Sequence, residues 1–428
     1  AAKRQAYQRL QIDAGSDGLS LALNLYCAAY LLPKLGTETN TDVPTTQDVM
    51  NALLGQPVSE RKKKAALSLA GRLPLLHWKL GFAQVFARGG FSVILANPPW
   101  ERMKLQEEEY FAERAPAVAE ARNKTERERA ISALSRSEQG TPERHIYDGF
   151  ISAKQIAEAS SAFCHGSRYP LTGVGDVNTY ALFAETALQI LHPLGRAGLV
   201  LPSGIAIDDS TKAFFRHIVD NDRLTSFLGF DNARRLFPAV HPDTPFCLLA
   251  LGAPSKDGIR FAHYILGVDE LSDARRSFTL TANDIARLNP NTRTCPVFRS
   301  QKDAEITKEI YQRVPVLWDE NKTDGNPWGV KFLTMFHMSN DSSLFRDSRR
   351  RNELVDSVPL YEAKMVHQFD HRWATYVGDG DDSRDMTDTE KENPYQSIQP
   401  RYWVERSAVE SRVADRNWSK SWMYGWRG

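Results

Sequence analysis

A short apolar run, residues 91–96, gives the most informative pattern in the chain. Two glycines precede it and two prolines follow it, and the run is partly β-branched, so the pattern predicts a buried β-strand rather than a helix. The strand leads directly into Asn97-Pro98-Pro99-Trp100. Open α/β sheets bind ligands at the carboxyl ends of their strands, so this loop is the first candidate for a functional site.

A second series of apolar patterns lies downstream. Helical spacing over residues 178–191 is followed, after a segment with Pro193 and two glycines, by a predicted buried strand at 199–202. The series continues with a short helix at 212–219 and strands at 226–230 and 246–251. This alternation of helices and strands predicts an α/β fold.

The other segments show mainly helical propensity and charge. Residues 5–34 and 47–72 predict a helical insertion before the strand at 91–96, and residues 255–330 mix strands with turns. Residues 101–165 are rich in charge and predict a solvated helical arm. The alternative for this arm is a lid or a contact to a nucleic-acid backbone directly after the loop at 97–100.

Composition narrows the class of protein. The chain has 428 residues with a net charge of +1, which argues against a surface that binds nucleic acid everywhere, although a local basic patch suffices. Its 4 cysteines have neither metal nor disulfide spacing, so we expect a reducing compartment and no metal. We find no signal peptide and no apolar run that spans a bilayer, and we therefore expect a cytoplasmic protein with no membrane partner.

The atoms of the loop at 97–100 suit an exocyclic amino group. The Asn97 side-chain oxygen accepts a hydrogen bond from such a group, and the prolines present carbonyl acceptors without N–H donors. Trp100 adds a wide apolar face that can stack a flat ring. Two acceptors aimed at one amino group leave its nitrogen lone pair free to attack an electrophilic methyl group. The alternative is an ordinary proline turn after a strand.

These residues resemble the S-adenosylmethionine (SAM) dependent amino-methyltransferases, in particular the N6-adenine DNA methyltransferases. The stretch from His77 to Gln106, with Trp rather than Tyr at position 100, is similar to the large methylases of type IIG restriction–modification and related phage-defence systems. Relatives with Tyr at this position include methylases of ribosomal RNA and of protein glutamine, which are the nearest alternatives.

The resemblance implies a fold, a reaction and residue roles. It implies the second half of a Rossmann-like methyltransferase sheet, and a flipped adenine bound by Asn97, Pro98, Pro99 and Trp100 in double-stranded DNA. Phe237 is the matching base-binding candidate, with core or loop packing as its alternative. We accordingly expect a helical region at 1–75, a catalytic half at 76–270 with its insertion at 101–165, and a linker with the start of a target-recognition region at 271–428.

The SAM-binding half is not found in the sequence. Such sites need a strand and a Gly-rich turn, and none precedes Asn97; Gly173-Val174-Gly175-Asp176 follows no strand and predicts a turn before the next helix. The cofactor-binding residues therefore stay unassigned. We expect the chain to be a fragment of a longer methylase whose missing N-terminal portion, or another defence-system subunit, completes the SAM site.

The segment 359–372 resembles the approach to the target-recognition domain of the type IIG relatives. We expect DNA contacts from its polar side chains, Lys364, His367, Gln368, His371 and Arg372. Two alternatives are a metal site on a helix face that His367 and His371 share, and a nuclease core at Glu362-Ala363-Lys364. The interleaved aromatic and basic residues of 395–428 suit a nucleic-acid surface and the packing of a domain equally.

The sequence thus predicts methyl transfer from SAM to the N6 amino group of adenine in DNA, within a restriction–modification or phage-defence system. The rival prediction is a non-catalytic DNA-binding or assembly module that lacks its cofactor half. A third is methylation of RNA or of protein glutamine.

Overall fold

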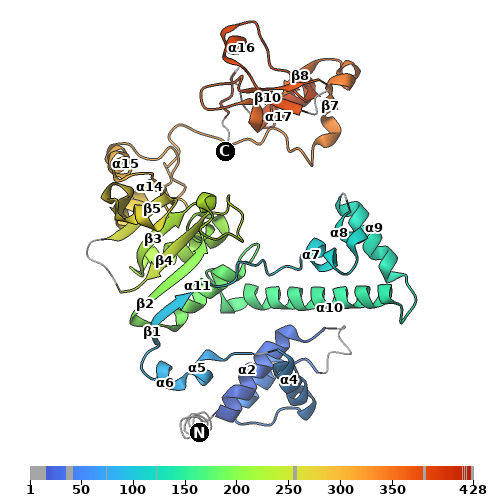
Figure 1. Cartoon of the computed structure of the whole chain (residues 1–428), viewed down its shortest axis with the longest axis vertical. Helices are drawn as coiled ribbons and strands as arrows, with labels where there is room; N and C mark the ends of the chain where they lie inside the picture. Colours follow the sequence, from blue (N-terminus) through green and yellow to red (C-terminus); the bar gives the residue numbers. More distant parts are fainter. Residues whose placement is uncertain are drawn as a thin grey trace. The chain divides into compact units, whose positions relative to one another are not determined.

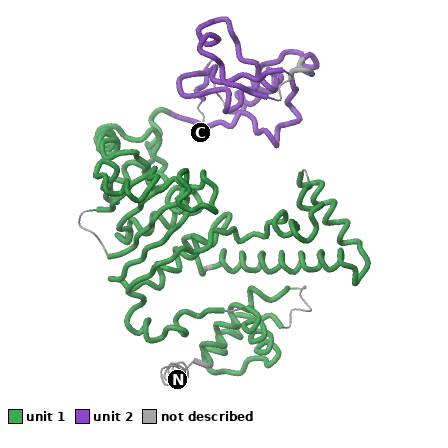
Figure 2. Tube along the Cα trace, in the orientation of Figure 1, with its two compact units in different colours: residues 1–328 green, residues 329–428 purple. Residues whose placement is uncertain are grey.

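The computed structural model describes residues 16–34, 42–73, 75–121, 123–253, 258–378, 382–416, 418, 420 and 422–425. The chain divides into two compact units, Ala1–Trp328 and Gly329–Gly428 (Figure 2). Residues 271–328, which the sequence grouped with the recognition region, thus belong to the first unit. The predicted helix over 5–34 is described only from Ser16 onward, and residues 5–15 lie outside the described residues.

A six-stranded mixed sheet forms the centre of the first unit (Figure 1). Its order is β1 (Phe91–Ala96), β2 (Leu191–Pro202), β4 (Phe246–Leu251), β3 (Leu224–Phe230), β5 (Ile259–Ile265) and β6 (Ser277–Leu280). β1 pairs in parallel with β2 and β3 in parallel with β5, whereas β4 and β6 are antiparallel to their neighbours. β1, β2, β3 and β5 therefore end at one edge of the sheet, here called the carboxyl edge. The α/β class and the strands at 91–96, 226–230 and 246–251 are confirmed, while the Rossmann-like arrangement stays a prediction.

The predicted break between helix and second strand is wrong. The helix α11 (Thr179–Ile190) ends directly at β2, and the strand runs from Leu191 instead of starting at 199. The reason is pairing: Leu191 already lies opposite Phe91, and Gly195 leaves room for the Phe91 carbonyl oxygen, which would lie 2.7 Å from an added Cβ. Pro193 and the glycines are therefore strand residues and not a linker.

Helices cover one face of this sheet. They are α11, α12 (Gly204–Ile207), α13 (Lys212–Asp220), α14 (Ala282–Leu288) and α15 (Gln301–Arg313). Alternate strand residues such as Leu199, Leu201 and Leu249 are buried against Phe214 and Phe215 of α13 in the main core. α13 buries four apolar side chains on its sheet-facing side because their i, i+1, i+4, i+5 spacing forms one helical stripe. A smaller cluster around Phe230 and Phe246 lies on the other face.

β1 is not the buried strand that the sequence predicts. It is the edge strand of the sheet, and Val93 is 64% and Leu95 81% exposed. Ile94 and Ala96, the alternate residues, pack against the main core. The prediction was wrong because an apolar run does not reveal what covers each face, and among the described residues nothing covers this one.

The elements before and after β1 are helical, as predicted. α2 (Ser16–Leu31), α3 (Thr46–Leu53) and α4 (Glu60–Arg72) enclose a small core around Leu25 and Leu69, and the short α5 (Trp78–Gly81) and α6 (Ala83–Phe86) lead to β1. The insertion contains α7 (Glu107–Ala112), α8 (Pro116–Ala119), α9 (Lys124–Ser135) and the long α10 (Pro142–Phe163), followed by a π-helical turn at Cys164–Arg168. No helix among the described residues is long and apolar enough to cross a membrane.

The second unit is built from short elements. Its three-stranded sheet has the order β7 (Arg346–Asp347), β11 (Tyr402–Glu405) and β8 (Ser357–Leu360), and β9 (Ala374–Val377) pairs with β10 (Asp382–Asp385). The helices are α16 (Asp388–Glu392) and α17 (Arg406–Ala414). Met365, Tyr376, Met386 and Ile398 form one core cluster. The 3₁₀ turns of the two units are Asp209–Thr211, Asn232–Arg234, Val268–Ser272, Ala274–Arg276, Ser342–Leu344, Ser348–Glu353 and Ala363–Met365.

His263 makes the stability of the first unit depend on pH. It is buried among the rings of Phe227, Phe261 and Phe278, and its Nε2 lies 3.8 Å from the Cys295 sulfur. Burial lowers the pKa of His263 from 6.5 to about 4. Between these pH values the unfolded chain binds a proton that the folded chain does not, so stability is full above pH 6.5 and falls as the pH drops toward 4.

Proton binding by His263 in the unfolded chain should lower the free energy of unfolding by about 3 kcal/mol as the pH drops through that range. Urea unfolding of the wild type and of His263→Phe at pH 7 and pH 4.5 measures the effect as a difference between the two chains. The variant should lose less stability on acidification than the wild type. Equal losses would mean that His263 is not kept neutral.

Candidate active site

The residues Asn97-Pro98-Pro99-Trp100 lie at the carboxyl edge, directly after β1. Asn97 and Pro99 are exposed, Pro98 is buried and Trp100 is half-buried. The strand fixes the start of the loop, and the two proline rings restrict its backbone. The loop therefore presents its polar atoms from a constrained frame.

Thr179, the first residue of α11, holds the loop from the other side. Its hydroxyl donates to the Pro99 carbonyl oxygen at 2.7 Å and accepts from the Glu101 N–H at 3.0 Å. The Thr179 N–H in turn donates to the Glu101 carbonyl oxygen at 2.9 Å. An isolated β-bridge between Arg102 and Asn178 extends this contact. Thr179 was not predicted as a site residue, and its only signal in the sequence was its place at the start of the helix before β2.

This anchoring leaves two acceptors unused. The Pro99 carbonyl oxygen accepts the hydrogen bond from Thr179. Among the described residues, the Asn97 side chain and the Pro98 carbonyl have no hydrogen-bond partner. Both belong to consecutive residues of the fixed loop. These are the two acceptors that the sequence assigns to one amino group, and their joint use stays a prediction.

Two aromatic rings meet beside these acceptors. The centroids of Trp100 and Phe237 are 6.4 Å apart with the rings 72° from parallel, and Phe237 also contacts Phe246 at 4.8 Å. The structure thus brings Phe237 to the predicted loop, although both its base-binding and its packing interpretation fit this position. The buried Trp100 Nε1 has no hydrogen-bond partner among the described residues.

Asn232 shapes the loop that contains Phe237. It is fully buried after β3, and its amide nitrogen donates to the carbonyl oxygens of Phe237 and Val240, both at 3.0 Å. Its amide oxygen accepts from the Phe237 N–H at 3.0 Å. Asn232 was not predicted as a site residue. Its position directly after a strand, before a proline-containing loop, was the available signal.

Asn232→Ala should destabilise the protein by about 2 kcal/mol, because it leaves buried backbone groups of the Phe237 loop without partners. Urea unfolding measures this change. Asn221→Ala is the matched control, since Asn221 is exposed and its side chain bonds only to its own helix. A cost for Asn232→Ala no larger than the control's would contradict the role of this side chain.

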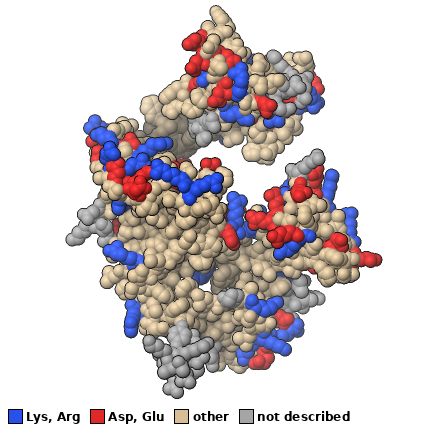
Figure 3. Space-filling model, in the orientation of Figure 1, with Lys and Arg blue, Asp and Glu red and all other residues tan. Residues whose placement is uncertain are grey.

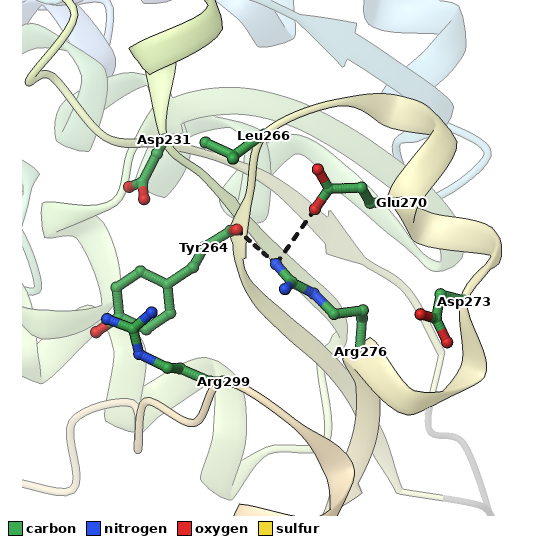
Figure 4. Close-up of a pocket in the computed structure, with 7 residues that line it drawn as sticks. All are labelled: Asp231, Tyr264, Leu266, Glu270, Asp273, Arg276 and Arg299. Atoms are coloured by element: carbon green, nitrogen blue, oxygen red, sulfur yellow. Dashed lines mark hydrogen bonds and ion pairs between the residues drawn. The ribbon is translucent and has the colours of Figure 1, made fainter.

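A polar pocket of about 520 Å³ lies farther along the carboxyl edge, at the ends of β3 and β5 (Figure 4). Tyr264 has a φ of +55°, and the Arg299 guanidinium lies 4.6 Å from its ring centroid. Arg276 donates to the Tyr264 carbonyl oxygen at 2.6 Å and pairs with Glu270 at 3.2 Å. These cationic side chains therefore already have partners within the pocket.

Charge of both signs surrounds this pocket. The Arg275 guanidinium lowers the pKa of the Asp273 carboxyl to about 2. Lys and Arg side chains gather beside acidic ones over the loops of this edge (Figure 3), and Arg234 and Arg235 are exposed after β3. The mixture agrees with the near-neutral composition and provides local cationic groups rather than a uniformly basic surface.

The five residues predicted to contact DNA lie in the second unit. Lys364, His367, Gln368 and His371 are exposed. Arg372 is half-buried, and its guanidinium donates to the carbonyl oxygens of Asn393 at 2.8 Å and Gln396 at 2.9 Å. Arg372 therefore stabilises its own unit. The His367 ring stacks on Trp373 and the Lys364 ammonium lies 5.1 Å from the Tyr376 ring centroid, whereas no such contact is found for Gln368 among the described residues. The contact of the four exposed side chains with DNA stays a prediction.

The metal and nuclease alternatives gain no support. His367 and His371 lie in a turn and not on a helix, so they do not share a helix face, and no metal-binding group of three or more ligands occurs among the described residues. Asp356, the upstream carboxylate that a nuclease core at Glu362-Ala363-Lys364 would need as a partner, pairs instead with Arg406 at 2.7 Å. Glu362 accepts a hydrogen bond from the Tyr376 hydroxyl at 2.9 Å.

Two further segments were left open by the sequence. Gly173-Val174-Gly175-Asp176 is an irregular segment before α11, and the buried Glu185 carboxylate fixes the preceding Thr172 through its N–H and hydroxyl at 2.9 and 2.7 Å. It follows no strand and is not a SAM-type glycine turn. In the C-terminal stretch Tyr402 packs on Phe345 and Tyr395 is 93% exposed, while Trp426 and Arg427 lie outside the described residues.

Comparison with known proteins gives little. No family model matches the chain, and no curated protein does. Among solved structures, it is similar to a modification subunit assigned to a type I restriction enzyme from Vibrio vulnificus, with 11% identity over 68% of this chain and 69% of that chain and a TM-score of 0.20. A likeness at that TM-score bears on neither the fold nor the function of this chain.

Proposed function

We propose that this chain belongs to a SAM-dependent methyltransferase that modifies the N6 amino group of adenine in double-stranded DNA, within a restriction–modification or phage-defence system. One observation carries the proposal. The Asn97 side chain and the Pro98 carbonyl are adjacent acceptors without partners among the described residues, on an anchored loop beside the Trp100 ring. An amino group on a flat ring calls for two acceptors and an aromatic face, and these residues supply both kinds of group.

Asn97, Pro98 and Trp100 bind and orient the amino group and its ring; none of them transfers a proton. The duplex hides the adenine edge, so the base must leave the stack and lie against Trp100. Asn97 and Pro98 then accept the two N6 hydrogens and hold the nitrogen lone pair out of the ring plane. The bound cofactor would supply an electrophilic methyl group. Because the amino group is neutral, its attack on such a methyl group would require no protonated side chain beforehand.

The described residues do not fit SAM by themselves. Neither a Gly-rich turn after a strand nor an acidic residue placed for a ribose is found among them. The uncovered face and edge of β1, with Val93 and Leu95 exposed, support the proposal that a further α/β segment adds to this strand and brings the SAM site. Without that segment, the chain acts as a DNA-binding or assembly module.

The uncovered face of β1 has a direct test in Leu95→Lys. The side chain is 81% exposed, so the variant should change the unfolding free energy of the isolated chain by no more than about 0.5 kcal/mol. Leu199→Ala, on the covered face and 2% exposed, should cost about 2–5 kcal/mol. If Leu95→Lys destabilised the purified chain as much as Leu199→Ala, some other element would already cover β1.

The function itself is tested by the transfer of labelled methyl groups from SAM to DNA by the chain together with the segment that brings the SAM site, with Asn97→Ala as the comparison. Product analysis distinguishes N6-methyladenine from methylated RNA or glutamine. Methyl transfer that depends on Asn97 and yields N6-methyladenine supports the proposal.

A further inference from the structure

A fully exposed phenylalanine stands at the tip of a tight turn in the second unit. Phe369 is 95% exposed. Its N-terminal neighbours His367 and Gln368 and the nearby His371 are also exposed. His367 and Asp370 close the turn with two backbone hydrogen bonds, of 2.8 Å to the Asp370 carbonyl oxygen and 3.0 Å to the His367 carbonyl oxygen. Gln368 and Phe369 are therefore the two central residues of a hairpin-like turn.

The backbone of Phe369 is strained. Its φ is +63°, a left-handed value, at the turn position where glycine or asparagine is ordinarily found. A bulky aromatic side chain there raises the energy of the folded chain and gains no packing in return, because the ring is exposed. Strain of this kind, at a residue that does not stabilise the fold, points to a function of the side chain.

Several side-chain contacts hold the base of this turn. The Asp370 carboxylate accepts from the Arg372 N–H at 2.8 Å and pairs with Lys391 at 2.9 Å. The His367 ring stacks on Trp373 with centroids 4.4 Å apart, and the Lys391 ammonium lies 4.4 Å from the Trp373 ring centroid. The turn base is thus tied to its unit by charge and by stacking. Only the tip projects.

We propose that Phe369 is a wedge that inserts its ring between stacked bases of duplex DNA. A rigid support and an exposed apolar ring are what insertion into a base step requires, since the ring must displace stacking without yielding itself. Gln368 and His371, exposed and within two residues of Phe369 in sequence, offer hydrogen bonds to base edges or phosphates. The inference rests on the proposed function for its partner, DNA, and adds a residue that the sequence analysis did not select.

Phe369→Gly separates this role from a structural one. Glycine adopts a φ of +63° without strain, so the variant should unfold at the same temperature as the wild type or higher. Its Kd for duplex DNA should rise roughly 5- to 150-fold, the range expected for the loss of one stacked base contact. Fluorescence anisotropy with the full chain and a labelled duplex measures Kd. Val355→Ala, which truncates another exposed apolar side chain of the same unit at 98% exposure, should leave Kd unchanged.

A second probe reports insertion itself. A 2-aminopurine placed at a deformable TA step should brighten when the wild-type chain binds, and should not when Phe369→Gly binds at saturating concentration. Unchanged affinity in Phe369→Gly, a lower unfolding temperature, or a wild-type chain that does not bind duplex DNA would each overturn the wedge. If Phe369→Gly loses affinity but Asn97→Ala keeps methyl transfer, the wedge stands and the proposed methyl transfer at Asn97 fails.

Discussion

Asn97→Ala should reduce methyl transfer to adenine by about 10²- to 10³-fold in an assay in which the wild-type chain methylates DNA. The alanine removes one of the two acceptors that orient the amino group and free its lone pair. Because the Asn97 side chain is exposed and has no partner among the described residues, its loss leaves no buried group unsatisfied. The unfolding temperature should therefore stay the same.

The matched control is Asn221→Ala, an exposed asparagine on the same unit and away from the carboxyl-edge loop. It should keep full activity. Labelled methyl groups recovered as N6-methyladenine after digestion give the rate for each chain. An Asn97→Ala chain as active as the control would remove the basis of the proposed mechanism.

Trp100→Ala should weaken capture of an extrahelical adenine by roughly 5- to 150-fold, since stacking of a base on an aromatic ring is worth about 1–3 kcal/mol. The Trp100 ring also contacts Phe237, and it packs against the main core and the smaller cluster around Phe230 and Phe246. This variant should therefore lose stability as well. Affinity is therefore compared at a temperature where circular dichroism shows the variant folded.

Trp100→Phe distinguishes stacking from packing. It keeps an aromatic face and removes the buried Nε1 that has no partner among the described residues, so we expect near wild-type stability and only a small loss of adenine affinity. A phenylalanine variant as weak in binding as the alanine variant would show that stacking does not explain the role of Trp100.

The sequence predicted the strands of the fold better than their environment. Residues 91–96 form a strand because their apolar, β-branched run lies between glycines and prolines, a local signal that survives in the structure. Their burial was predicted wrongly, since burial depends on what lies against Val93 and Leu95 and local pattern cannot supply it. The start of β2 was missed for a similar reason. Its first residues are paired by β1, and a strand that begins directly after a helix has no turn signal.

In the candidate site, the chemical groups were predictable from the sequence and the contacts that hold them were not. The acceptors and the aromatic face of Asn97-Pro98-Pro99-Trp100 follow from the residue types alone. The loop lies at the carboxyl end of β1, as predicted. Thr179 holds this loop through a contact between segments far apart in sequence, which no local pattern encodes. Asn232 holds the Phe237 loop through bonds to nearby residues, but the direction of its side chain depends on how that loop folds back after β3. Phe369 was missed because its signal is a backbone angle and an exposure, and neither is visible in the sequence.

The central claim is that the loop at 97–100 recognises the amino group of an unpaired adenine. Binding to a duplex with adenine opposite an abasic position, compared with the same duplex carrying purine without the amino group, tests it without a cofactor. We predict that the wild-type chain binds the adenine duplex more tightly and that Asn97→Ala loses this preference. Equal affinity of the wild type for both duplexes, or a preference that survives in Asn97→Ala, would contradict the account.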